Sequence, residues 1–281
     1  MPTAAIDGIE TYYVVSGSGP PLLLFSPGGF NATLENWSSF GIYQRLDLLP
    51  RLAAHYTCIA FDRRESGRSG GRVERITWAD YAAQGRGLLD ELGIERARLL
   101  GGCIGCSCVA AFAVAYPQRV ERMVLYSPAG GPRYRLTQEA RFAEHVAYVA
   151  EHGLEAVVAL AKSGEQTFSQ DPRVGPWVAV LRNDPAFPAR YVERNAGEYL
   201  ALVEQMAAGL FDRDTVPGPS PEELLALELQ ALVVPGHDSS HATSAARYLE
   251  ECLEGSEYWD VPPEEQTAEN APARVLDFLQ Q

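Results

Sequence analysis

Basic residues are scarce in this chain of 281 residues, and lysine is almost absent. The sequence holds 23 Lys and Arg against 37 Asp and Glu, a formal net charge of −14, and Lys162 is its single lysine. An acidic surface repels nucleic-acid phosphates and anionic lipid headgroups. We therefore expect no nucleic-acid partner and no membrane partner. The partner that we expect is a small-molecule substrate.

Long apolar runs and a signal-peptide pattern are also missing. No stretch approaches the roughly 20 apolar residues that a membrane-spanning helix needs, and residues 1–7 have neither a basic segment nor an apolar core. Cysteine is limited to five, an odd number with three clustered at 103, 106 and 108. That is not the pattern of a secreted disulfide framework. These absences predict a cytoplasmic protein.

Short apolar runs alternate with helical periodicity in both the first and the last part of the chain. Strands are predicted at 9–17, 21–25, 56–61, 98–100, 122–126, 231–234 and 257–261. Helices are predicted at 41–54, 77–92, 105–116, 241–253 and from about 270. This alternation predicts an α/β fold with a mostly parallel sheet and flanking helices.

The middle of the chain has a different pattern. Helical periodicity dominates at 137–162 and 189–210, and no run between 131 and 225 has the pattern of a central strand. We predict an inserted helical cap over 131–225, between core parts 1–130 and 226–281. Aromatic residues of the cap either line an apolar pocket or form the core of the lid: Tyr148, Phe168, Trp177, Phe187, Tyr191, Tyr199 and Phe211.

Cys103 lies at the centre of Gly101-Gly102-Cys103-Ile104-Gly105, a Gly-x-Cys-x-Gly sequence between a predicted strand and a predicted helix. This is the nucleophile-elbow pattern with sulfur in place of oxygen. The glycines allow a sharp turn that a side chain would obstruct. The alternative is a buried, inert cysteine in a glycine-rich turn.

In this order, the loop 26–29, the turn 62–69, the Cys103 elbow and Gly236-His237-Asp238 resemble the α/β-hydrolase family over essentially the whole chain. The resemblance implies that Cys103 is the nucleophile and Asp238 the acid. It implies one oxyanion donor in the N–H of Ile104. The other comes from the loop of Gly28, Gly29 and Phe30, with the N–H of Gly29 or Phe30 expected. In the same way, Asp62, Arg63 and Arg64 are expected to form a structural turn.

The histidine of that family pattern is missing. The stretch 261–269, where the resemblance places it, contains none, and no histidine follows His241. His241 is therefore the first candidate for the base, His237 the second, and Glu264 or Glu265 the third. Each also has a structural interpretation, as a histidine bonded to backbone or as a solvated loop carboxylate. His145 and His152, on the cap, are expected at the surface.

A cysteine at the elbow is consistent with a missing histidine. A thiol has a reference pKa of about 8.5 that a helix N-terminus can lower, although an ionised Asp238 nearby would raise it. We expect a hydrolase or acyl transferase that attacks a small or medium apolar ester, thioester or lactone and forms an acyl-thioester. No metal is expected, because the cysteine spacing matches no common zinc pattern. No cofactor is expected either.

Two other classes of function stay open at this point. Without the usual histidine, the chain could bind a small ligand under the cap without catalysis. Cys103 and Cys106 form a Cys-x-x-Cys pair, which some thiol-redox proteins use. A homodimer is left open by the sequence.

Overall fold

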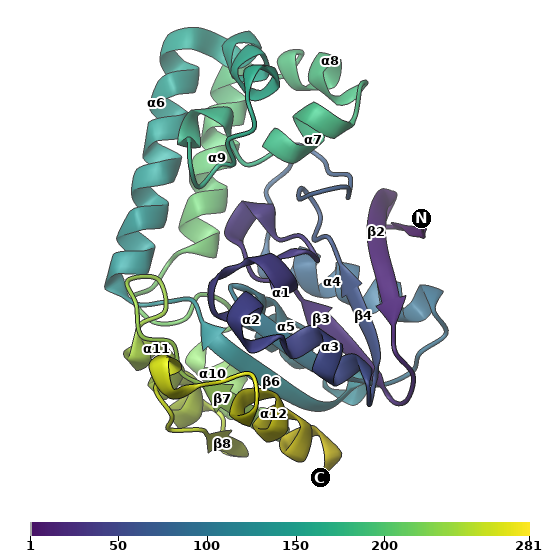
Figure 1. Cartoon of the computed structure of the whole chain (residues 1–281). Coiled ribbons are helices and arrows are strands. Elements are labelled where there is room, and N and C mark those ends of the chain that lie inside the picture. The colour runs from purple at the N-terminus through teal and green to yellow at the C-terminus, as the bar shows by residue number, and fades with distance from the viewer. Residues whose placement is uncertain (1) are drawn as a thin grey trace.

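An eight-stranded sheet forms the centre of the structure, a computed structural model that describes residues 2–281 (Figure 1). Its strands are β1 (Thr3–Ile6), β2 (Ile9–Ser16), β3 (Pro21–Phe25), β4 (Thr57–Phe61), β5 (Ala97–Cys103), β6 (Val120–Pro128), β7 (Ala231–Val234) and β8 (Ser256–Tyr258). The spatial order is β1-β2-β4-β3-β5-β6-β7-β8. The β1–β2 and β2–β4 pairs are antiparallel, and every other pair is parallel. The predicted α/β class with a mostly parallel sheet is confirmed.

Helices cover both faces of this sheet. One face carries α1 (Asn36–Ser39), α2 (Gly41–Leu46), α3 (Leu48–Ala53) and α12 (Asn270–Gln280), and the other carries α4 (Trp78–Glu91), α5 (Gly105–Ala115) and α11 (Thr243–Cys252). Alternate residues of a strand therefore enter different cores. In β3, Leu22 and Leu24 face the first group of helices, while Leu23 and Phe25 face the second. This explains the unbroken apolar run of that strand.

A layer of helices lies above the sheet, at the top of Figure 1. It consists of α6 (Pro132–Ser163), α7 (Val178–Asn183), α8 (Phe187–Val192) and α9 (Ala196–Leu210). The short helix α10 (Pro221–Leu225) falls within the range predicted for the cap, yet it packs against α5 and α11 of the core. Four single-turn 3-10 segments complete the chain: η1 (Gly29–Asn31), η2 (Pro117–Arg119), η3 (Pro172–Val174) and η4 (Pro263–Glu265).

Two predicted helices are each divided in the structure. The helix predicted at 41–54 becomes α2 and α3, because Asp47 takes a left-handed conformation with φ 50° between them. The helix predicted at 189–210 becomes α8 and α9, because the Asn195 side chain caps a new helix by accepting the Glu198 N–H. Within residues 2–281, no helix is long and apolar enough to cross a membrane.

Candidate active site

Cys103 sits at the apex of a sharp turn between β5 and α5. Its φ is 55°, in the left-handed region that non-glycine residues rarely adopt. The two flanking glycines are required by close packing. A Cβ on Gly105 would lie 2.1 Å from the Phe25 carbonyl oxygen, and one on Gly101 would lie 2.5 Å from the Gly105 carbonyl oxygen. The turn therefore has the backbone form of a nucleophile elbow.

The Cys103 thiol is 7% exposed and faces three polar groups. The N–H groups of Ile104 and Gly28 point at the sulfur, and the imidazole of His241 lies beside it. The thiol also stands at the N-terminus of α5, where the peptide dipoles favour negative charge. Burial alone would raise the pKa of Cys103, but the His241 charge and these hydrogen bonds outweigh it and lower that pKa.

His241 connects Cys103 to Asp238. Its Nδ1 lies 2.9 Å from both carboxylate oxygens of Asp238, and its side chain is 15% exposed. Its Nε2 is buried and has no hydrogen bond of standard geometry within residues 2–281. The Cys103 thiol is nonetheless close enough for the two groups to shift each other's pKa. The three side chains thus lie in series, with His241 between the Cys103 thiol and the Asp238 carboxylate.

The charges in this series support one another. Burial disfavours the imidazolium, yet the Cys103 thiolate and the Asp238 carboxylate together raise the pKa of His241 to about 10. The hydrogen bond from His241 lowers the pKa of Asp238 to about 2. The arrangement therefore favours a thiolate–imidazolium pair in which the acid fixes the ring.

The loop after β7 holds this histidine against the sheet. Asp238 Oδ1 accepts the backbone N–H groups of Ser240 and His241, and the segment at His241 forms a parallel bridge with Gly130, just after β6. A Cβ on Gly236 would lie 2.3 Å from the His241 Cβ, so only glycine fits there. A tight turn thus places a histidine three residues after its acid, and both act from one loop.

Comparison with known proteins agrees with this geometry. Residues 21–160, about half of the chain, match the family model described as the alpha/beta hydrolase fold. The chain belongs to the α/β-hydrolase family. The enol-lactonase from Burkholderia xenovorans has the same fold, with a TM-score of 0.64 and 22% identity over the whole of both chains.

Two curated relatives in this family share part of the sequence. The dihydrolipoyllysine-residue acetyltransferase component of the acetoin cleaving system from Cupriavidus necator is 37% identical over 127 residues, 45% of this chain and 32% of that protein. The 2-hydroxymuconate semialdehyde hydrolase from a Pseudomonas species is 34% identical over 127 residues, 44% of this chain and 41% of that protein. The chain thus aligns with less than half the length of each.

The stretch 261–269, where the resemblance places the usual histidine, contains a buried glutamine. Gln266 donates from Nε2 to the Val261 carbonyl at 2.8 Å, and its Oε1 accepts the Tyr126 hydroxyl at 2.5 Å. Glu264 and Glu265 lie in η4 with exposed side chains. The structure therefore does not bring these two carboxylates to Cys103. His237 is likewise exposed, on a cleft that Asp238 also lines.

The oxyanion loop, defined as residues 27–31, is held by two side chains from outside it. Asn36 Nδ2 donates to the Pro27 carbonyl at 2.7 Å, and Arg63 Nη2 donates to the Gly29 carbonyl. The N–H of this loop that faces the sulfur is that of Gly28, whereas the resemblance implied Gly29 or Phe30. The sequence placed Arg63 in a structural turn. Its role at the loop was missed, because only the fold brings the two segments together.

The rest of that turn is structural, as expected. The buried Asp62 carboxylate accepts the Leu34 N–H at 2.9 Å and the Arg68 N–H at 2.9 Å, and Arg68 Nε donates to it at 2.8 Å. Arg64 pairs with the fully buried Glu65 at 3.0 Å. These bonds fix the loops at the carboxyl ends of β3 and β4 relative to each other.

The cap aromatic residues divide into two groups. Phe168 packs edge-to-face on Phe30 at 5.5 Å, and Phe211 packs on Tyr134 at 5.9 Å. These four rings belong to the buried apolar cluster that also contains Cys103. Trp177, Tyr191 and Tyr199 pack on one another within the helical layer above the sheet.

One expectation for the cap is wrong. His145 is completely buried, with Nε2 2.7 Å from the Tyr199 hydroxyl and Nδ1 3.2 Å from the Arg173 carbonyl. Burial lowers its pKa to about 4. The polar residues around His145 in the sequence lie on the other side of α6, which is why it resembled a surface position. His152 is exposed, as expected.

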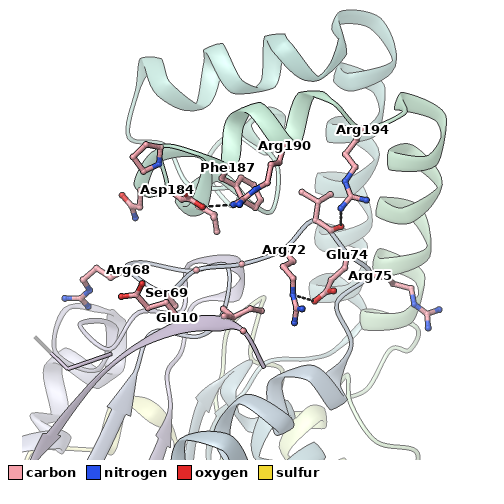
Figure 2. Close-up of a pocket in the computed structure, with 18 of the residues that line it drawn as sticks. Glu10, Arg68, Ser69, Arg72, Glu74, Arg75, Asp184, Phe187, Arg190 and Arg194 are labelled. Atoms are coloured by element: carbon pink, nitrogen blue, oxygen red, sulfur yellow. Dashed lines mark hydrogen bonds and ion pairs between the residues drawn. The ribbon is translucent and has the colours of Figure 1, made fainter. Parts of the chain in front are cut away.

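A cleft of about 1080 Å³ lies between the core and the cap, but Cys103 and His241 do not line it. Figure 2 shows its arginines on both sides, from the loop after β4 and from α8. Most are already paired, Arg72 with Asp7 and Arg190 with Asp184 among them. This cleft is therefore separate from the polar groups that surround Cys103.

Proposed function

We propose that this chain is a cysteine-dependent hydrolase or acyl transferase that uses Cys103, His241 and Asp238. The observation that carries the proposal is the position of His241, which bonds Asp238 through Nδ1 at 2.9 Å and lies beside the Cys103 thiol through Nε2. A thiolate, an acid–base group and two N–H donors then surround one point.

The reaction proposed for this site proceeds in two halves. The Cys103 thiolate attacks the carbonyl carbon and forms an S–C bond, and the carbonyl electron pair becomes an oxyanion facing the N–H groups of Ile104 and Gly28. Collapse of the oxyanion breaks the bond to the leaving group, which takes the proton from the His241 imidazolium. The product is an acyl-thioester on Cys103.

The second half removes the acyl group. Neutral His241 accepts a proton from water, or from an alcohol or thiol acceptor, as that nucleophile attacks the thioester carbon. Collapse of this second oxyanion releases the acid or the transferred ester and restores the thiolate. Asp238 keeps the ring oriented and stabilises its positive charge in both halves.

The substrate proposed is a small or medium apolar ester, thioester or lactone. The buried apolar cluster that contains Cys103 also contains the aromatic rings of Phe30, Tyr134 and Phe168, which favour an apolar acyl group. Related proteins include hydrolases of ring-cleavage products, an enol-lactonase and esterases. Cytoplasmic location and a homodimer stay predictions.

The observations weigh against the two alternatives. A non-catalytic role was suggested by the missing histidine, but His241 lies between Asp238 and Cys103 and can take the place of that histidine. A redox role needs Cys106, whose thiol instead donates to the Gly101 carbonyl at 3.2 Å, and all five cysteines are free and buried. Burial raises the pKa of Cys106 well above its usual value, so this thiol is held protonated.

Acylation by an activated ester tests the proposal. Incubation with p-nitrophenyl butyrate, followed by mass spectrometry of the intact protein, should show one butyryl group on the wild type and none on Cys103→Ala. Cys106→Ala is the matched control and should be acylated normally. A wild type that gains no acyl group from any of a broad panel of esters and thioesters contradicts the proposal.

A further inference from the structure

Arg63 is a buried cation beside the catalytic elbow with no carboxylate partner. Its side chain is 3% exposed, and within residues 2–281 no Asp or Glu forms an ion pair with it. Its guanidinium lies over the Tyr81 ring at 4.4 Å, and its Nε is buried without a hydrogen bond. Burying a charge in this way costs free energy that an ion pair usually offsets, so the contacts that it does make need an explanation.

Two contacts define where Arg63 acts. Nη2 donates to the carbonyl of Gly29 in the oxyanion loop, and Nη1 donates to the Cys108 thiol at 3.3 Å, in the first turns of α5. Arg63 therefore connects the oxyanion loop directly to the helix that carries the elbow. Its neighbour Arg64 bonds the acidic side chains Glu65 and Glu74 instead and does not contact the loop.

The oxyanion loop depends on such an anchor. Gly28 has φ 118° and Gly29 has φ 49°, so two consecutive glycines give this segment conformational freedom. A trans peptide is planar, with its C=O and N–H pointing in opposite directions. Asn36 holds the Pro27 carbonyl, so the Gly28 N–H of the same peptide points the other way, toward Cys103.

We propose that Arg63 is a positioning residue, which holds the Gly29–Phe30 peptide by its carbonyl and so fixes the far end of the two-glycine segment that presents the Gly28 N–H to the reacting atoms. Asn36 and Arg63 then hold the two peptides that flank the Gly28–Gly29 peptide, one carbonyl each. The inference rests on the proposed function. Arg63 then promotes stabilisation of the oxyanion indirectly, through the position of the oxyanion loop, and not through a contact with the sulfur.

Two reactions of the same thiol separate this role from a merely structural one. Acylation by p-nitrophenyl butyrate passes through an oxyanion, whereas alkylation by iodoacetamide displaces iodide at a saturated carbon and forms none. Both rates scale with the thiolate fraction of Cys103, so their ratio at one pH is independent of that fraction. The ratio therefore measures how well the oxyanion loop stabilises the oxyanion.

In Arg63→Met, we expect the ratio of acylation rate to alkylation rate to fall about 10- to 100-fold. This is no more than the effect of removing one oxyanion donor, because the donor is still present and only its position is less well held. Arg63→Lys, which keeps the charge and one donor, should recover part of the ratio, and it decides the question if Arg63→Met does not fold. Arg72→Met, at an exposed arginine that pairs with Asp7, is the control and should leave the ratio unchanged.

The outcomes separate the two proposals. An unchanged ratio in a folded Arg63 variant, or an equal fall in Arg72→Met, overturns the role of Arg63 while leaving acylation of Cys103 established. A wild type that is alkylated and never acylated overturns the proposed function itself.

Discussion

Replacing His241 should slow the alkylation of Cys103 near pH 6. His241→Asn removes the imidazolium whose charge lowers the pKa of the thiol, and leaves burial to raise it. A thiol at the reference pKa of about 8.5 is roughly 0.3% ionised at pH 6. The wild-type thiol, with a lowered pKa, presents a larger thiolate fraction at the same pH.

The size of the effect follows from two opposing changes. Each unit of pKa changes the thiolate fraction about tenfold, while a Brønsted slope of about 0.4–0.5 makes the less basic thiolate roughly threefold less reactive. The net effect is about threefold for each unit by which the pKa differs between wild type and variant. Since burial raises the pKa of the variant's thiol while that of the wild type is lowered, we expect His241→Asn to reduce the alkylation rate at pH 6 by at least about threefold.

The assay is the rate of carbamidomethylation of Cys103 by iodoacetamide, followed by mass spectrometry at pH 6 and again at pH 9.5. The difference should narrow at pH 9.5, because the thiolate fraction of the variant rises with pH more than that of the wild type, whose pKa is lowered. His237→Asn, an exposed histidine of the same loop, is the control. Equal rates for wild type and His241→Asn at pH 6 would refute the pairing of Cys103 with His241.

Three further predictions concern the acid, the position without a histidine and the cap. Asp238→Asn should reduce kcat about 10- to 100-fold, less than the roughly 10⁴-fold seen for a buried triad acid, because its side chain is 61% exposed; unchanged ester hydrolysis would argue against its role. Gln266→Ala should lower the free energy of unfolding by about 2 kcal/mol, because it leaves the buried Tyr126 hydroxyl without a partner. It should not change the alkylation rate of Cys103, and a large fall in that rate would mean that Gln266 acts in the site. The pKa of His145 is about 4 in the fold and about 6.5 in the unfolded chain, so the unfolded chain binds the proton first as the pH falls. The free energy of unfolding should therefore decrease by about 3 kcal/mol between pH 6.5 and pH 4. Denaturant titrations should show that His145→Gln loses this pH dependence, and an identical pH profile for the two proteins would contradict the prediction.

Local patterns of the sequence predicted most of the core. The run Pro21–Phe25 is β3 without a change of boundary, and the glycines around Cys103 give the elbow that the turn requires. Strand β1 was not predicted, because four residues with alternating burial at a sheet edge give too short a signal. The division at Asp47 was also missed, since a left-handed aspartate has no strong mark in sequence.

The site was only partly visible for a different reason. Cys103 and Asp238 were marked by motifs, and His241 was one of four candidates for the base. What distinguishes His241 is a tight turn at Gly236 and a bridge to Gly130, which exist only once β6 and β7 are adjacent. The same holds for Arg63 and the oxyanion loop, whose contact joins residues 34 positions apart.

The central claim is that Cys103 forms an acyl-thioester that His241 helps to hydrolyse. The most direct measurement is the mass of the protein during reaction with p-nitrophenyl butyrate, with the modified residue located by peptide mapping. The account predicts one butyryl group on Cys103 that clears over time in the wild type and persists in His241→Asn. An adduct on another residue, or no adduct under any ester, would contradict it.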